Sequence, residues 1–138
     1  MVRRHCIALG LLAGLAGFLP AAAAQPSART PATILVVGDS LSAEYGLKRG
    51  SGWVALMEQR LAQEKISATV VNASISGDTT SGGRSRLPVL LAKHKPTHVI
   101  IELGGNDALR GLPLTMTEDN LKAMTQAAQA AKAKVLLL

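Results

Sequence analysis

The sequence has 138 residues, of which 48% are hydrophobic and 2% aromatic, and a formal net charge of +6 at pH 7. This length is typical of about one domain. The basic residues are scattered along the chain without a run, and almost no aromatic residue is present to stack on bases, so we expect no nucleic-acid binding. We interpret the surplus positive charge as a soluble surface.

Residues 1–24 are predicted to be a secretory signal peptide. Arg3 and Arg4 precede an apolar run, residues 7–19, and an Ala-Ala-Ala tripeptide ends at Ala24. This three-part pattern predicts export to the periplasm or the medium, with cleavage after Ala24. The apolar run is too short to span a bilayer comfortably, so no stable membrane anchor is expected. The alternative interpretation is a retained amphipathic anchor.

Cleavage would remove Cys6, the only cysteine, so the exported protein is expected to have no disulfide and no thiol chemistry. Residues 25–31 contain two prolines and are predicted to be a linker. The folded portion is therefore expected to be residues 32–138, a length that can bury a modest core.

A short apolar run, residues 34–37, is predicted to form a strand that is buried on both faces. Gly-Asp-Ser-Leu-Ser follows at residues 38–42 and places the Ser40 hydroxyl at the carboxyl end of that strand. Open α/β sheets bind their ligands at this end. The alternative is an ordinary strand-to-helix turn, in which Asp39 or Ser40 caps the next helix.

A helix is predicted from Trp53 to about residue 64, with Trp53, Leu56, Met57 and Leu61 on the side that covers the sheet. Trp53 is interpreted as a core residue. The alternative is that its indole forms one wall of a substrate pocket.

The second strand is predicted at residues 68–73, and a helix at about residues 81–94. Pro88 is expected either to kink this helix or to mark its true first turn. Asn72 begins a glycosylation pattern, an interpretation that a bacterial-type signal sequence weakens.

The third strand is predicted at residues 97–103, and a loop of small and polar residues follows at 104–107. Thr115 and Glu118 form a capping-box pattern, which predicts the start of a long helix that ends near residue 133. Residues 135–138 are expected to begin a fourth strand. The order β-α-β-α-β-α-β is typical of a parallel sheet with helices on both faces.

In such a sheet the strand-to-helix loops lie along one edge, so Ser40, Gly77 and Asn106 can converge. Ser40 offers an oxygen nucleophile. Gly77, which has no Cβ, can bring a backbone N–H close to a ligand. Asn106 offers side-chain donors, and a developing oxyanion needs such fixed donors. These residue types favour acyl transfer.

Other classes of site are not supported by the sequence. It contains no Gly-x-Gly-x-x-Gly loop for a dinucleotide and no Walker pattern with its lysine. It also lacks the Gly-x-Ser-x-Gly of an ordinary nucleophile elbow. No group of His, Cys and carboxylate residues has the spacing of metal ligands. We therefore expect neither a cofactor nor a metal.

Three blocks of this sequence together resemble the SGNH (GDSL) hydrolases: residues 38–42, the glycine of residues 76–78, and Gly-Gly-Asn-Asp at residues 104–107. Two longer runs, 71–79 and 102–111, are similar to the branch of periplasmic acyl-thioesterases, lysophospholipases and arylesterases. The resemblance covers essentially all of the folded portion. It implies the SGNH hydrolase fold, a flavodoxin-like three-layer α/β/α sandwich with a parallel sheet.

The resemblance also implies roles for site residues. Ser40 would be the nucleophile that forms an acyl-enzyme, and the N–H groups of Ser40 and Gly77 with the Asn106 side chain would form the oxyanion hole. Four residues would support these loops, mainly through turn and cap hydrogen bonds: Gly38, Asp39, Gly105 and Asp107. The implied partner is a small-molecule acyl ester or thioester, and the full-length protein is expected to be a monomer.

The fourth block of that family, Asp-x-x-His with the catalytic base, is absent from this sequence. His94 and His98 are expected at the opposite edge of the sheet, because the strand from His98 to Leu103 spans roughly 16 Å. A serine without a base is a poor nucleophile, so the chain itself is expected to be inactive.

Two hypotheses remain for this inactive chain. It is either the N-terminal part of a serine esterase or thioesterase, truncated after the start of the fourth strand, or a non-catalytic acyl- or ester-binding or unstable remnant. In a truncated chain the apolar residues 34–37 are expected to be partly exposed.

Overall fold

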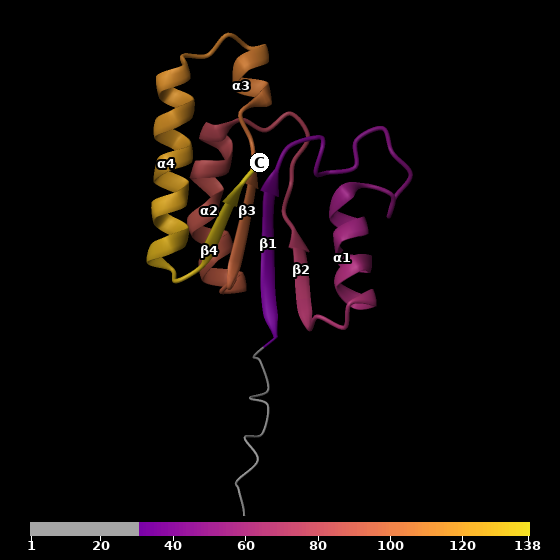
Figure 1. Cartoon of the computed structure of the whole chain (residues 1–138). Coiled ribbons are helices and arrows are strands. Elements are labelled where there is room, and N and C mark those ends of the chain that lie inside the picture. Colours follow the sequence, from indigo (N-terminus) through magenta and orange to yellow (C-terminus); the bar gives the residue numbers. More distant parts are fainter. Residues whose placement is uncertain (1–30) are drawn as a thin grey trace, which may run out of the picture.

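The computed structural model describes residues 31–138, so the predicted signal peptide and most of the predicted linker lie outside the described residues. Figure 1 shows the arrangement of the helices and strands. The elements are, in chain order, β1 (Ala32–Gly38), α1 (Trp53–Gln63), β2 (Ala68–Asn72), α2 (Thr80–His94), β3 (His98–Glu102), α3 (Gly105–Leu109), α4 (Leu114–Ala130) and β4 (Lys134–Leu137).

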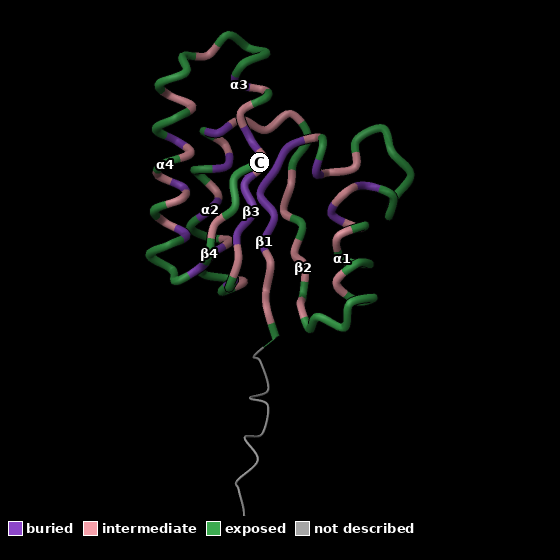
Figure 2. Tube along the Cα trace, viewed as in Figure 1, coloured by how far each residue is buried: buried purple, intermediate pink, exposed green. Residues whose placement is uncertain are grey.

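The strands form one parallel sheet in the order β2-β1-β3-β4. β1 pairs on both sides, and its residues Leu35, Val36 and Val37 have no exposed surface. Figure 2 shows this buried stretch in the middle of the sheet. The expectation that these residues would be partly exposed is therefore wrong for all but Ile34, because α1, α2 and α4 together cover both faces of β1.

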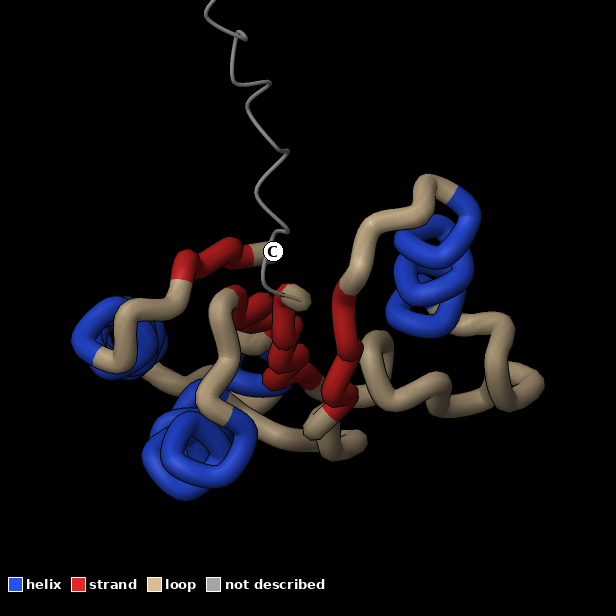
Figure 3. Tube along the Cα trace, turned by 90° about the horizontal axis from the view of Figure 1, so that it is seen from below, coloured by secondary structure: helices blue, strands red, loops and turns tan. Residues whose placement is uncertain are grey.

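Helices cover the sheet from both sides, which confirms the predicted three-layer α/β/α arrangement (Figure 3). α2 and α4 pack on one face, where Leu87, Leu91 and Met124 contact the sheet. α1 packs on the other face through Val54, with Trp53 and Met57 partly buried beside it. No helix within residues 31–138 is long and apolar enough to cross a membrane.

The structure corrects four local predictions. Leu56 is 54% exposed, because Val54 faces the sheet in its place. Pro88 lies well inside α2, so it does not mark the first turn of that helix. α4 begins at Leu114 after Pro113 without a side-chain cap, so the capping box at Thr115 does not form. The predicted loop after β3 contains the short helix α3.

Candidate active site

The loops that follow β1, β2 and β3 meet at the carboxyl edge of the sheet (Figure 1). The side chain of Asn106 connects them. Its amide nitrogen donates 2.9 Å hydrogen bonds to the carboxylate of Asp39 and to the backbone oxygen of Asp78. Asn106 thus contacts the residue before Ser40 and the residue after Gly77, which places the three predicted residues in one region.

The turn that carries Ser40 is ordered by its neighbours. The Asp39 carboxylate accepts the N–H of Leu41 at 3.0 Å, and the Ser40 backbone oxygen accepts the N–H of Tyr45 at 3.1 Å. The Ser40 hydroxyl itself, which is half-buried, has no hydrogen-bond partner among residues 31–138. The turn is therefore held without using the hydroxyl, which remains available to a ligand.

Two backbone donors at this edge are also unpartnered within the described part of the chain. The N–H groups of Ser40 and Gly77 make no hydrogen bond there, whereas those of Leu41 and Asp78 do. Gly77 has a φ of +78°, a left-handed conformation that glycine adopts without a Cβ penalty. Arg110 donates to its backbone oxygen at 2.7 Å. Free N–H groups beside a free hydroxyl form an arrangement suited to an anionic oxygen.

Asn106 differs from these donors because both of its amide hydrogens have protein acceptors in this structure. An amide that donates to Asp39 and Asp78 has no hydrogen left for a ligand. Stabilising an oxyanion through this side chain therefore requires one of the two bonds to be exchanged for a bond to the substrate.

The sequence did not predict a second layer of side chains, which supports the Ser40 turn through hydrogen bonds to Glu102 and Ser42. Glu102, at the end of β3, accepts a 2.7 Å hydrogen bond from the Ser42 hydroxyl and a 3.5 Å bond from the N–H of Asp39. The Trp53 indole donates to the same hydroxyl at 3.1 Å. A Cβ at Gly38 would lie 2.5 Å from that hydroxyl oxygen, so this layer requires glycine there. A charged residue at the end of an apolar strand was the available sequence signal.

Trp53 packs in the core, as the first of the two interpretations of the sequence expected, and it also supports the Ser40 turn. Its indole packs beside Val54 in the core that α1 forms with the sheet. Its N–H reaches Ser42, two residues after Ser40. The structure includes it in the support of the turn, and nothing shows it as a pocket wall.

Asp107 has no exposed surface and joins α2, α3 and α4. Its carboxylate accepts the backbone N–H of Thr80 at 2.9 Å, the hydroxyl of Thr80, and the hydroxyl of Thr117 at 3.4 Å. Asn120, also buried, donates to the Thr80 hydroxyl at 3.0 Å. Asp107 thus holds the helix that carries Asn106. Gly105 beside it would bring a Cβ to 3.7 Å from the Asp39 carboxylate, an ordinary contact.

Arg86 connects the loops that follow β1 and β2. It forms a 2.9 Å ion pair with Asp78, donates to the backbone oxygen of Ala73, and lies 3.4 Å from the backbone oxygen of Gly38. The side chains of Arg86 and Asp78 are 20% and 11% exposed, so solvent screens this pair less than a surface pair.

The two histidines in the described region lie far from Ser40. His98 begins β3 and pairs in register with Ile34 and Lys134, at the amino edge of the sheet. His94 ends α2, whose 15 residues span about 21 Å from the edge where Ser40 lies. Neither can act as its base. Residues 31–138 hold no cluster of His, Cys, Asp and Glu suited to a metal ion.

Comparisons with known proteins agree with this arrangement. Residues 36–138 match the GDSL-like Lipase/Acylhydrolase family. The chain is 59% identical over 106 residues to the esterase TesA of Pseudomonas aeruginosa, covering 77% of this chain and 53% of that protein. It is 49% identical over 106 residues to thioesterase 1/protease 1/lysophospholipase L1 of Escherichia coli, covering 77% and 50%.

Solved structures show the same similarity. A crystal structure of TesA superimposes with a TM-score of 0.75, covering 76% of this chain and 58% of that one. The psychrotrophic esterase EstA from Pseudoalteromonas sp., inhibited by monoethylphosphonate, gives 0.73 at 48% identity and covers 76% and 57%. The chain spans about half the length of the curated relatives it matches.

Proposed function

The chain belongs to the GDSL-like lipase/acylhydrolase family, and we propose that it carries the nucleophile and oxyanion hole of a serine hydrolase of carboxylic esters and thioesters. One observation carries this proposal. Asn106 bridges the loops of Ser40 and Gly77, and at that junction the Ser40 hydroxyl and the N–H groups of both residues lack partners within the described residues.

The chemistry follows from these groups. The Ser40 oxygen attacks the carbonyl carbon of the substrate, and the carbonyl oxygen becomes an oxyanion. The N–H groups of Ser40 and Gly77 stabilise this charge, and Asn106 joins them by releasing Asp39 or Asp78. Each such donor contributes about 3 kcal/mol to the transition state. The alcohol or thiol then leaves, and water hydrolyses the acyl-enzyme on Ser40.

The proton of the Ser40 hydroxyl needs an acceptor, and no side chain of residues 31–138 is hydrogen-bonded to that hydroxyl. In the resembled family this acceptor is the histidine of the Asp-x-x-His block, a block that this sequence lacks. We propose that the 138-residue chain alone is not a competent hydrolase, since His94 and His98 lie at the opposite edge. The alternative function is ester or acyl binding without turnover at the same free donors.

The proposal includes export. The pattern of basic start, apolar run and Ala-Ala-Ala at residues 1–24 supports it. The intact mass of the chain recovered from the periplasm should correspond to a protein that begins at Gln25. A cytosolic protein that retains Met1 would contradict export without affecting the proposed chemistry.

A chimera tests the enzymatic part. The half of Pseudomonas aeruginosa TesA that this chain does not match would be joined after Leu138, since the matched halves are 59% identical. We expect the chimera to hydrolyse p-nitrophenyl esters and acyl-CoA and to bind a fluorophosphonate probe covalently, and we expect Ser40→Ala to abolish both.

The unextended chain is the control for this chimera. We expect it to show no turnover, because the Ser40 hydroxyl has no hydrogen-bond acceptor among residues 31–138 and both described histidines lie at the opposite edge. Turnover by the unextended chain that depends on Ser40 would show that another group acts as base. Unchanged turnover in the Ser40→Ala chimera would refute the proposed nucleophile.

A further inference from the structure

Three helices end in the same unusual way at the amino edge of the sheet, opposite Ser40. Each is followed by a lysine in the left-handed conformation: Lys65 after α1, Lys95 after α2 and Lys132 after α4, with φ values of 55°, 45° and 64°. The N–H of each lysine bonds back to its helix, at Ala62, Leu91 and Gln129 respectively. These are left-handed helix C-caps, a position where glycine is the usual residue.

A lysine is a strained choice at this position. The left-handed conformation brings Cβ close to the following carbonyl oxygen, a penalty that glycine avoids. Strained backbone of this kind persists where the residue has another role. One left-handed lysine would need no explanation, but the same choice at all three of these turns indicates that the ammonium groups matter.

The sheet register gathers these lysines. β3 and β4 are adjacent, and the N–H of Lys134 bonds to the backbone oxygen of Thr97 at 2.9 Å. Lys95 lies two residues before Thr97, and Lys132 lies two residues before Lys134. Lys65 precedes β2, two strands away from β3. Lys65 follows α1, which packs on the face of the sheet opposite α2 and α4, so the three lysines share the amino edge and lie on both faces of the sheet.

Charge is segregated along the strand direction. Five lysines at the amino edge are exposed: Lys65, Lys93, Lys95, Lys132 and Lys134. Of the nine carboxylate side chains in the sequence, all within the described residues, only Glu64 lies there, and Arg60 pairs with it at 2.8 Å. Five others lie at or after the carboxyl ends of the strands: Asp39, Glu44, Asp78, Glu102 and Asp107.

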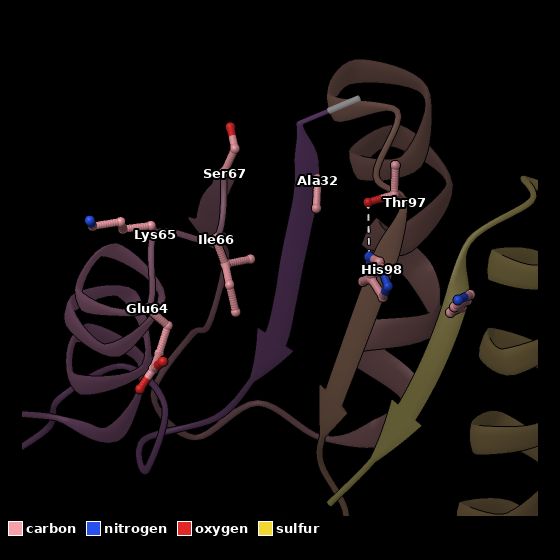
Figure 4. A pocket seen from close by; sticks show the side chains of 8 residues that line it. Ala32, Glu64, Lys65, Ile66, Ser67, Thr97 and His98 are labelled. Atoms are coloured by element: carbon pink, nitrogen blue, oxygen red, sulfur yellow. Dashed lines mark hydrogen bonds between the residues drawn. The ribbon is translucent and has the colours of Figure 1, made fainter. Parts of the chain in front are cut away.

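The basic edge surrounds an open cavity of about 940 Å³. Lys65 lines it from the α1–β2 connection and His98 from the start of β3, as Figure 4 shows. Lys134 lines it from the start of β4. Ile66, 52% exposed, is the large apolar side chain in this lining. The edge as a whole carries five exposed lysines and a single carboxylate, a charge balance that favours an anionic partner.

The helix dipole does not by itself explain the lysines. Cations near a helix C-terminus are stabilised, and Lys93 in the last turn of α2 is placed for this without backbone strain. Lys65, Lys95 and Lys132 lie one step further, in the position that imposes strain. The dipole therefore accounts for cations at this edge and leaves the left-handed lysines unexplained.

We propose that this amino edge, which carries Lys65, Lys95 and Lys132, is an electrostatic docking surface for an anionic phospholipid membrane. Lysines beside a membrane are attracted to acidic headgroups through space and need no deep pocket. A nucleic acid is disfavoured because the described aromatic residues, Tyr45 and Trp53, lie in and after the loop at the other edge. Docking in this way directs the Ser40 edge away from the lipid.

The test compares two triple variants of the whole chain in co-sedimentation with vesicles of phosphatidylglycerol and phosphatidylcholine. One variant is Lys65→Gly, Lys95→Gly, Lys132→Gly. The other is Lys48→Gln, Arg49→Gln, Lys122→Gln, exposed residues of the loop before α1 and of α4, which changes the net charge equally. Residues 1–30 are the same in both variants, so their contribution to binding cancels.

We expect the glycine variant to lose about 100-fold in vesicle binding, roughly fivefold for each lysine. Its Tm should be unchanged or higher, because glycine relieves the strain. The glutamine variant should lose less than tenfold. Lys65→Arg, Lys95→Arg, Lys132→Arg should keep the binding, and high salt should abolish it in every protein.

Three results would overturn the proposal. The first is equal loss in the glycine and glutamine variants, which would make net charge the only determinant. The second is no binding of the unaltered chain to acidic vesicles at low salt. The third is tighter binding to duplex DNA than to vesicles at equal phosphate concentration, which would assign the surface to nucleic acid. None of these measurements depends on hydrolysis, so they stand apart from the test of Ser40.

Discussion

The side-chain amide of Asn106 donates a 2.9 Å hydrogen bond to the carboxylate of Asp39, the residue directly before Ser40. Because the same amide also donates to the backbone oxygen of Asp78, one side chain holds the first and second loops in place. It occupies the junction at which we propose that an oxyanion is stabilised. Asn106 is therefore expected to contribute both to the order of the loops and to catalysis.

Replacing Asn106 by alanine separates these contributions. In the chimera we expect Asn106→Ala to lower kcat on a short-chain ester by roughly 100-fold or more, because an oxyanion donor is lost. KM should change much less, since the bond forms with the transition state. Thr115→Ala, an exposed residue on α4, is the control and should keep full activity. A loss of less than threefold in Asn106→Ala would exclude the side chain from the oxyanion hole.

Asp107 is predicted to matter for stability. Asp107→Ala would leave the backbone N–H and the hydroxyl of Thr80 buried without their acceptor. We expect the free energy of unfolding to fall by about 2–4 kcal/mol, measured by urea denaturation. Asp119→Ala, at an exposed position on α4, should change it by no more than about 0.5 kcal/mol. Similar urea-denaturation midpoints for Asp107→Ala and Asp119→Ala would show that the buried hydrogen bonds of Asp107 give no net stabilisation.

Ser42 is predicted to control the environment of Trp53, the only tryptophan in the sequence. Ser42→Ala removes the acceptor of the indole N–H and one of the two donors to Glu102. We expect the tryptophan emission to shift and the stability to fall by about 1–3 kcal/mol, because buried polar groups lose partners. Ser51→Ala, in the exposed loop, should leave the emission unchanged. An unshifted spectrum in Ser42→Ala would contradict the hydrogen bond.

Glu44 is predicted to stabilise its loop in a pH-dependent way. Hydrogen bonds from the N–H groups of Gly50 and Gly52, with a smaller contribution from Arg49, lower the pKa of its carboxyl group below the ordinary value. A carboxyl group whose pKa is lower when folded stabilises the protein above its unfolded pKa. This contribution is lost as the pH falls through the folded pKa.

Glu44→Gln measures that effect. The difference in Tm between the chain and this variant should be largest near neutral pH and should shrink as the pH drops below the ordinary carboxyl range. The carboxylate is solvent-exposed, so the difference is expected to be small and to decrease with added salt. A difference that grows toward acid pH would have the wrong sign.

Local patterns in the sequence were enough to predict the elements that form the sheet. Apolar runs such as residues 34–37 and helical spacing such as that of Trp53 and Met57 predicted the order of strands and helices, because burial depends on which residue types repeat. Topology then predicted that the loops of Ser40, Gly77 and Asn106 meet, since parallel strands end at one edge. The short helix α3 was missed because Gly105 is a poor helix former and its neighbours are polar.

Only the tertiary structure decided which groups touch. Glu102 supports the Ser40 turn because β1 and β3 pair in a register that puts Gly38 opposite Glu102, and register depends on the whole sheet. The basic residues look scattered along the sequence, yet the structure gathers five lysines at the amino edge, where three helices end. Composition gives only the net charge of the chain. Electrostatic attraction depends on where the charged side chains lie in the folded structure, and these lysines lie where the strands begin.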